Sequence, residues 1–188
     1  MDAIFSRVSI RQFTADPVED KKVTALMKAA MAAPSAGNQQ PWEFYVVTNP
    51  ALIEKLGTAT KYSEPAGRAP LCIVPCVRTN GLRHAAYVQQ DMGACIENLM
   101  LEAVEQGLGT VWMGVAPKEG RMEIVRNMLN IPANLDPFAI IAVGYPAEEK
   151  QQEDRFDAGR VHYLKAASQT ETIELTPAGA FLRKAINK

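Results

Sequence analysis

The chain has 188 residues, 47% of them apolar, and is long enough to bury a hydrophobic core as one domain. Its 20 basic and 21 acidic residues nearly cancel. This balance argues against binding to nucleic acid or to an anionic membrane. No stretch reaches the ~18 apolar residues of a membrane helix, and no secretion signal opens the sequence. We therefore expect a cytoplasmic protein.

The three cysteines and two histidines show no metal or catalytic spacing. Cys72, Cys76 and Cys95 form no Cys-x-x-Cys pair, and the first two lie in an apolar run typical of a buried strand. Buried thiols are the expected role, because cysteine is a common core residue. His84 and His162 have no motif around them. We expect neither a metal site nor a histidine-based triad.

The first informative segment is 7–13, which reads Arg-Val-Ser-Ile-Arg-Gln-Phe. In a strand, Arg7, Ser9 and Arg11 would share one face. Two guanidinium groups and a hydroxyl could then converge on one anion, such as a phosphate. The alternative is an exposed basic edge strand, since arginine and serine are ordinary surface residues.

A helix is predicted from Pro17 to about Ala33, with Asp16 as its cap. It leads into a loop, 34–42, that contains two prolines, a glycine and three side-chain amides. The prolines exclude regular structure there. The amides, hydroxyl and peptide N–H groups suit a planar, hydrogen-bonding heterocycle. The alternative is a structural turn anchored by a buried Trp42.

The rest of the chain alternates between strand and helix patterns. The longest helix is predicted over 85–107, with an apolar stripe wide enough to be enclosed on most sides. After the last strand the sequence is polar, and no repeat or flexible linker marks a second domain. We expect one domain over 1–188, with 146–188 as an arm onto a neighbouring subunit. The remaining predictions are strands at 43–48, 71–77, 109–115 and 137–145, helices at 50–56 and 118–129, and loop or broken helix at 58–70.

Four sequence motifs occur in the order found in the nitroreductase family, which this chain resembles. They are Arg-x-Ser-x-Arg-x-Phe at 7–13, the proline-rich loop at 34–42, the glycine-rich segment 107–114, and Gly-Tyr-Pro at 144–146 followed by Arg155. The resemblance spans nearly the whole chain. It implies an α+β, three-layer fold with a mixed, mainly antiparallel sheet between helices. It also implies a domain-exchanged homodimer that holds FMN at the subunit interface.

The resemblance further implies roles for individual residues. Arg7 would hold the flavin phosphate, with help from Arg155. Val8 and Ser9 would line the ribityl chain, and Arg11 would lie near N1 and O2 of the ring.

Other positions would complete the flavin site. The backbone around Met113 and Gly114 would face the flavin N5. One departure concerns Glu153, which stands where many family members have a second basic residue for the phosphate. The loop 58–70 gives no secure match to further flavin contacts. The other subunit would contribute Pro34, Ser35, Ala36 and Asn38.

The function implied is that of an FMN-dependent NAD(P)H oxidoreductase. It would reduce nitroaromatics, quinones or similar flat electrophiles by ping-pong hydride transfer. The cofactor carries this chemistry, so no protein acid or base is required. The alternatives are a non-catalytic FMN-binding or storage module, and a family variant that dehalogenates its substrate or destroys flavin.

Overall fold

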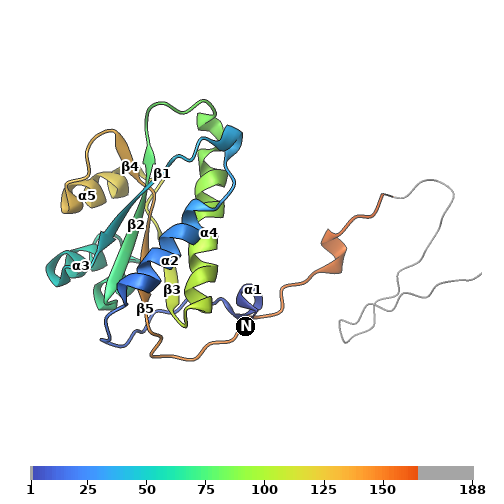
Figure 1. Cartoon of the computed structure of the whole chain (residues 1–188), viewed down its shortest axis with the longest axis horizontal. Helices are drawn as coiled ribbons and strands as arrows, with labels where there is room; N and C mark the ends of the chain where they lie inside the picture. Colours follow the sequence, from blue (N-terminus) through green and yellow to red (C-terminus); the bar gives the residue numbers. More distant parts are fainter. Residues whose placement is uncertain (1, 165–188) are drawn as a thin grey trace, which may run out of the picture. The chain divides into compact units, whose positions relative to one another are not determined.

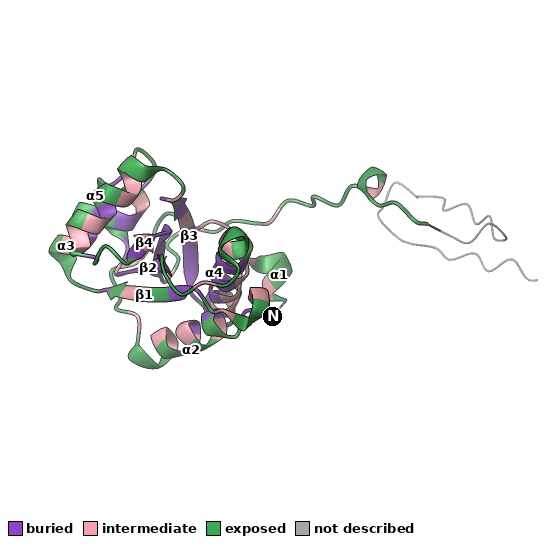
Figure 2. Ribbon diagram, turned by 90° about the horizontal axis from the view of Figure 1, so that it is seen from above, coloured by how far each residue is buried: buried purple, intermediate pink, exposed green. Residues whose placement is uncertain are grey.

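The computed structural model describes residues 2–164. Contacts between residues divide the chain into two units, Met1–Gln152 and Glu153–Lys188, and each is considered by itself. In the first unit a five-stranded sheet lies between two layers of helices (Figure 1). Helices α2 (Asp20–Met31) and α4 (Val88–Glu105) cover one face of the sheet, and α3 (Pro50–Gly57) and α5 (Glu119–Leu129) cover the other (Figure 2). This is the expected three-layer α+β fold.

The sheet is antiparallel between its strands, in agreement with the mainly antiparallel sheet that was predicted. Its strands follow the order β1-β2-β5-β3, and β4 pairs with β2 beside this path. Every strand pair is antiparallel. The one parallel contact within residues 2–164 is an isolated bridge between Ser9 and Thr110. The strands are β1 (Trp42–Val47), β2 (Leu71–Arg78), β3 (Gly109–Gly114), β4 (Leu135–Pro137) and β5 (Ala139–Gly144).

Helix α4, Val88–Glu105, is the longest described helix and runs along the sheet. A short 3₁₀ turn, Ala85–Tyr87, precedes it, so the predicted helix is confirmed with a tighter first turn. Helix α3 starts at Pro50, where the Asn49 side chain accepts hydrogen bonds from two backbone N–H groups. The other helices are α1 (Ala3–Ser6), α2 (Asp20–Met31), α3 (Pro50–Gly57) and α5 (Glu119–Leu129), and further 3₁₀ turns lie at Ala36–Asn38, Glu64–Arg68 and Ala158–Arg160.

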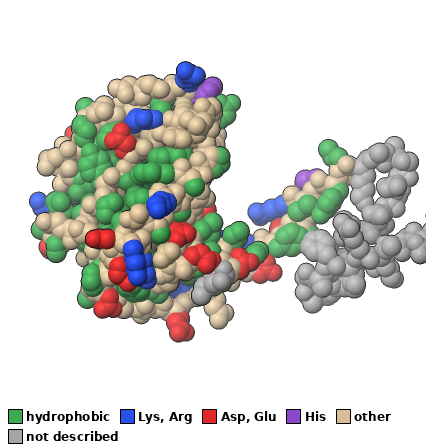
Figure 3. Space-filling view, in the orientation of Figure 1, with side chains coloured by type: hydrophobic (Ala, Val, Ile, Leu, Met, Phe, Trp, Pro, Cys, Tyr) green, Lys and Arg blue, Asp and Glu red, His purple; other side chains and the backbone are tan. Residues whose placement is uncertain are grey.

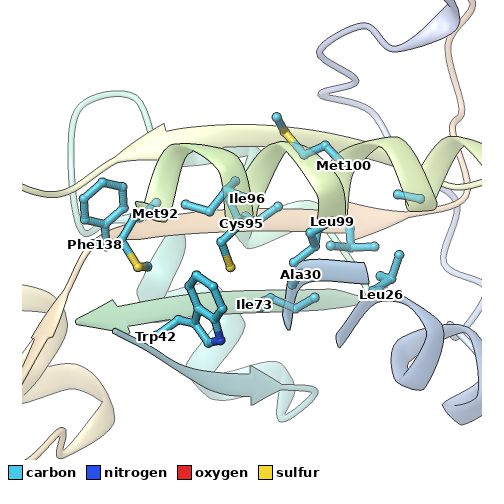
Figure 4. Packing of buried hydrophobic residues seen from close by; sticks show 14 of the residues in the cluster. Leu26, Ala30, Trp42, Ile73, Met92, Cys95, Ile96, Leu99, Met100 and Phe138 are labelled. Carbon is cyan, nitrogen blue, oxygen red and sulfur yellow. The ribbon is translucent and has the colours of Figure 1, made fainter. Parts of the chain in front are cut away.

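The apolar core lies in two clusters, one on each face of the sheet. Strands β2 and β5 are buried along almost their whole length, because helices cover both of their faces. On the α2–α4 face, Trp42 projects from β1 toward α4 and belongs to the same apolar cluster as Ile73 of β2 (Figure 4). Only 7% of Trp42 is exposed, so this tryptophan fixes the end of the 34–42 loop to the core.

Two predicted elements differ from those observed. Helix α2 begins at Asp20 rather than Pro17, and Glu19 occupies its cap position. Asp16 therefore lies four residues before the first helical residue, too far to cap it, and its carboxylate accepts a hydrogen bond from the Thr14 hydroxyl at 2.7 Å. The predicted strand at 137–145 is divided into β4 and β5. Phe138 separates them, because its N–H donates to the Pro75 carbonyl and its own carbonyl accepts from two residues after β3.

The cysteines are buried and free, as expected. Burial raises the pKa of each thiol, that of Cys72 to about 12. Within residues 2–164, no cluster of histidine, cysteine and acidic side chains could hold a metal ion. In the same part of the chain no helix is long and apolar enough to cross a membrane. On the face seen in Figure 3, acidic and basic side chains are interspersed.

Candidate flavin site

The segment 7–11 runs extended from the end of α1 and docks against the start of β3. Ser9 forms a bridge with Thr110, and the Ile10 N–H donates to the Thr110 carbonyl at 2.9 Å. Ile10 is buried against Gly109, where an added Cβ would lie 2.8 Å from the isoleucine side chain. Glycine is therefore required at 109. The predicted strand is an extended segment held by isolated bridges, not a full strand.

Arg7 is the most enclosed cation of this segment. Its side chain is 19% exposed, and its Nε lies 3.2 Å from Glu97 Oε1 on α4. The glutamate engages Nε and leaves the two Nη groups of the guanidinium for another acceptor. Val8 and Ser9 are half-buried beside it. This geometry suits a cation that is oriented by the protein and shares its charge with a ligand.

Arg11 and Lys150 both approach the same backbone carbonyl. Arg11 Nη1 donates to the Ser9 carbonyl at 3.3 Å, and Lys150 Nζ donates to it at 3.2 Å. Glu148 lies between them, because its Oε1 accepts from the backbone N–H groups of Arg11 and Gln12 and its Oε2 lies 2.8 Å from Lys150. Hydrogen bonding from Lys150, and then from the Arg11 N–H, lowers the pKa of Glu148.

Sequence reasoning missed Lys150. It follows two glutamates in a polar segment after the last strand, where no periodicity or motif marks it. The only available signal was the basic residue that the family pattern led us to expect at 153. Lys150 places a third cation next to Ser9, together with Arg7 and Arg11 in the same short segment.

The 34–42 loop is held in shape by a buried acid. Asp91, on the first turn of α4, is only 4% exposed. Its Oδ1 accepts from the Ala36 N–H at 2.9 Å, and its Oδ2 accepts from Gln39 Nε2 at 2.7 Å. Gln39 also pairs with the His84 backbone, accepting from the N–H and donating to the carbonyl. Asp91 therefore joins the loop to α4, and Gln39 joins it to the 79–84 segment.

Other polar groups of the loop also form hydrogen bonds within the protein. The Ser35 hydroxyl accepts from the Gln40 N–H, and the Gln40 side chain donates to Asn38 Oδ1. Arg78 Nη2 donates to the carbonyls of Gln39 and Gln40. The backbone has positive φ at Gly37, Asn38 and Gln40. The loop is thus a rigid turn, and its exposed residues are Pro34, Gly37, Asn38 and Gln40.

The 34–42 loop and segment 7–11 contact helix α4 at different positions along its axis. Asp91 and Glu97 are six residues apart on α4, which corresponds to ~9 Å along the axis. No hydrogen bond or ion pair in the first unit joins Arg7, Ser9 or Arg11 to residues 34–38. Within one chain, the two predicted sets of flavin-binding residues, in segment 7–11 and in residues 34–38, are therefore not linked by a hydrogen bond or an ion pair.

The end of β3 has one buried and one open residue. Met113 points into the core, whereas Gly114 is exposed and an added Cβ there would meet no atom within 4 Å. Arg121 Nη1 donates to the Gly114 carbonyl at 3.1 Å. The predicted role of Arg155 remains a prediction, because this exposed residue belongs to the second unit.

Comparisons with known proteins identify the family. The model of the nitroreductase family matches residues 4–70 and 57–145. A protein from Archaeoglobus fulgidus, named as a candidate NADH dehydrogenase/NAD(P)H nitroreductase, is 38% identical over 86% of this chain and 95% of its own length.

Solved structures agree with this assignment. A candidate NADH oxidase from Clostridium acetobutylicum is 43% identical, with a TM-score of 0.84, covering 88% of this chain and 100% of that one. A candidate nitroreductase from Desulfovibrio desulfuricans, solved in complex with FMN, is 28% identical, with a TM-score of 0.74, covering 87% and 95%. The chain therefore belongs to the nitroreductase family and is, at that level, an oxidoreductase.

Proposed function

We propose that this protein is an FMN-dependent NAD(P)H oxidoreductase that reduces nitroaromatics, quinones or similar flat electrophiles by a ping-pong reaction. The observation that carries the proposal is the pairing of a cationic segment with an open strand end. Arg11 and Lys150 donate to the Ser9 carbonyl near the start of β3, and Arg7 lies two residues before Ser9, paired with Glu97. Gly114 lies exposed at the other end of this strand.

These features fit the two ends of FMN. From Thr110, which pairs with Ser9, to Gly114 is four strand residues, or ~13 Å. That span is comparable to the reach of an extended ribityl phosphate plus part of the ring. The cations suit the phosphate, and the open backbone at Gly114 suits the close approach of a planar ring. The donor set therefore fits the cofactor.

Each residue of the segment then has a distinct task. Arg7 holds the phosphate through its free Nη groups, while Glu97 fixes the guanidinium by binding Nε. Val8 and Ser9 line the ribityl chain, and Arg11 places positive charge near N1 and O2. The backbone of Met113 and Gly114 lies beside N5. When bound, FMN supplies the redox chemistry, accepting a hydride from NAD(P)H and passing electrons to the acceptor.

Lys150 can supply the positive charge that is missing at position 153, where this sequence has a glutamate. A phosphate site that lacks a basic residue at 153 needs positive charge from elsewhere. Lys150 Nζ already lies 3.2 Å from the Ser9 carbonyl. We include it, together with Arg7, among the cations that bind the phosphate.

The site requires a homodimer in this proposal. No hydrogen bond or ion pair joins residues 34–38 to segment 7–11 within the first unit, so Pro34, Ser35, Ala36 and Asn38 would reach the flavin of the partner subunit. Residues 147–152 hydrogen-bond to the N-terminal segment of their own chain, so in this proposal the arm that crosses onto the partner begins after Gln152, and its residues 165–188 lie outside those described. Sedimentation at micromolar concentration should show a dimer only. A stable monomer that retains FMN would contradict this arrangement.

The activity is tested with purified protein. We expect bound flavin in the absorption spectrum, and oxidation of NADH or NADPH that is much faster with menadione or a nitrofuran than with dioxygen alone. Flavin binding without such turnover would favour a storage or binding module. A protein that fails to take up added FMN would overturn the proposal.

A further inference from the structure

A cationic and aromatic cluster lies beside Gly114, and nothing in the proposed flavin site uses it. Tyr62, in the loop before the 3₁₀ turn 64–68, is 59% exposed. Lys61 Nζ lies 4.8 Å from the centroid of its ring, and Arg121 Cζ lies 5.8 Å from the same centroid. The two cations come from different parts of the fold, since Arg121 belongs to α5.

The positive charge of this cluster is not neutralised. Among residues 2–164, no carboxylate lies within ion-pair distance of Lys61 or Arg121. By contrast, Arg68 pairs with Glu64, and Arg126 pairs with Asp136. Two cations next to one ring repel each other, and the ring offsets only part of this repulsion. An anion placed between them would relieve it.

The cluster is also fixed at the strand end where the reaction is proposed to occur. Arg121 Nη1 donates to the Gly114 carbonyl, which uses one of five guanidinium N–H donors. No other hydrogen bond of this side chain is present in the described part of the chain. The free donors and the Tyr62 face therefore lie close to the open backbone of Gly114.

We propose that Lys61, Tyr62 and Arg121 form a subsite for an anionic group on a molecule that reacts at the flavin. The inference rests on the proposed function and narrows its substrate class. The anion is a carboxylate or phosphate attached to an aromatic or nucleotide body, since the ring contributes a stacking surface. Two sources share this chemistry. One is the 2′-phosphate of NADPH, and the other is a carboxylated electron acceptor.

Kinetics with matched substrates separate the two sources. The donor arm compares NADPH with NADH, and the acceptor arm compares 4-nitrobenzoate with nitrobenzene. Arg121→Gln should reduce the preference for the anionic member of one pair by about fivefold, through KM, because a partly exposed charge pair contributes up to ~1 kcal/mol. Arg121→Lys should restore most of the preference. Lys28→Gln, an exposed change on α2 across the sheet, is the control.

A binding measurement avoids dependence on turnover. Calorimetry should show that 2′,5′-ADP binds more tightly than 5′-AMP, or that benzoate binds more tightly than benzamide, and that Arg121→Gln removes the difference. Equal binding within both pairs, or a difference that survives Arg121→Gln, would overturn the subsite. Absence of FMN uptake and of turnover would instead overturn the proposed function. A protein that turns over both members of each pair equally well would retain the function without the subsite.

Discussion

The 34–42 loop and the 7–11 segment were both expected to bind flavin, yet they are built in opposite ways. In the loop, most polar side chains bind the loop itself or its supports, and the buried Asp91 accepts one hydrogen bond from the Gln39 side chain and one from the Ala36 N–H. In the segment, Arg11 is exposed and its guanidinium donates only to the nearby Ser9 carbonyl. The comparison teaches that polar residues in a loop can specify its shape, whereas loosely engaged cations remain available to a ligand.

Removing Asp91 should give the largest effect. Asp91→Ala deletes two charge-assisted hydrogen bonds and leaves the Ala36 N–H and the Gln39 amide without their acceptor. We expect a loss of ~3 kcal/mol in the free energy of unfolding, measured with urea. Asp20→Ala is the control, because Asp20 is an exposed acid in the first turn of α2. Equal losses in the two variants would show that Asp91 acts only through the helix terminus.

The corresponding change in the segment should affect binding instead of folding. Arg7→Ala removes a charge-assisted donor to the phosphate, and FMN affinity should fall by about thirtyfold, or ~2 kcal/mol. The urea midpoint should change little, because the Glu97 partner of Arg7 is 47% exposed and such pairs contribute little to stability. Titration of FMN into the refolded apoprotein measures the affinity. Undiminished affinity would move the phosphate away from Arg7.

A third change tests how tightly the loop is packed. Gly37 has a φ of +56°, and an added Cβ would lie 2.6 Å from His84 Nε2. Gly37→Ala should cost ~1–2 kcal/mol of unfolding free energy, from backbone strain together with the displaced imidazole. Gly81→Ala is the matched control, because Gly81 has a φ of +71° with no atom within 4 Å. A loss no larger than that in the control would mean that His84 moves away freely.

The sequence predicted the architecture well because the core patterns are strong. The apolar runs of β2 and β5 predict strands that are buried on both faces. The apolar stripe of α4 predicts a helix that packs on the sheet. The predicted boundaries of helices and strands were less accurate where a single side chain determines them. Asp16 had an acceptable capping residue type, but its carboxylate is bound to Thr14 instead.

The site was predicted less completely, because its contacts join residues that are distant in the sequence. The Asp91 to Ala36 bond spans 55 residues, and the Lys150 to Ser9 bond spans 141. The interpretation of the loop as a turn anchored by Trp42 is confirmed by the burial of that residue. The other prediction, that the side-chain amides of the loop bind a heterocycle directly, is not supported within one chain. Gln39 and Gln40 hydrogen-bond to protein groups instead.

The smallest predicted effect concerns Arg11. Its guanidinium makes one long hydrogen bond, to the Ser9 carbonyl at 3.3 Å, so its charge is available to stabilise the negative charge that FMN gains near N1 on reduction. Arg11→Gln should keep most of the FMN, because the phosphate contacts come from other residues. The loss of ~1 kcal/mol from the anionic form of a two-electron couple lowers the midpoint potential by ~20 mV.

A redox titration against a dye of known potential measures this shift at Arg11. Arg11→Lys keeps the charge and should keep most of the potential. Oxidation of NADH should slow in Arg11→Gln, because the driving force of that half-reaction falls, while the step that reduces the acceptor should be affected less. If the potential is unchanged and FMN is lost instead, Arg11 belongs with Arg7 among the cations that bind the phosphate. The segment would then bind only one end of the cofactor, and the charge near N1 would have to come from another group.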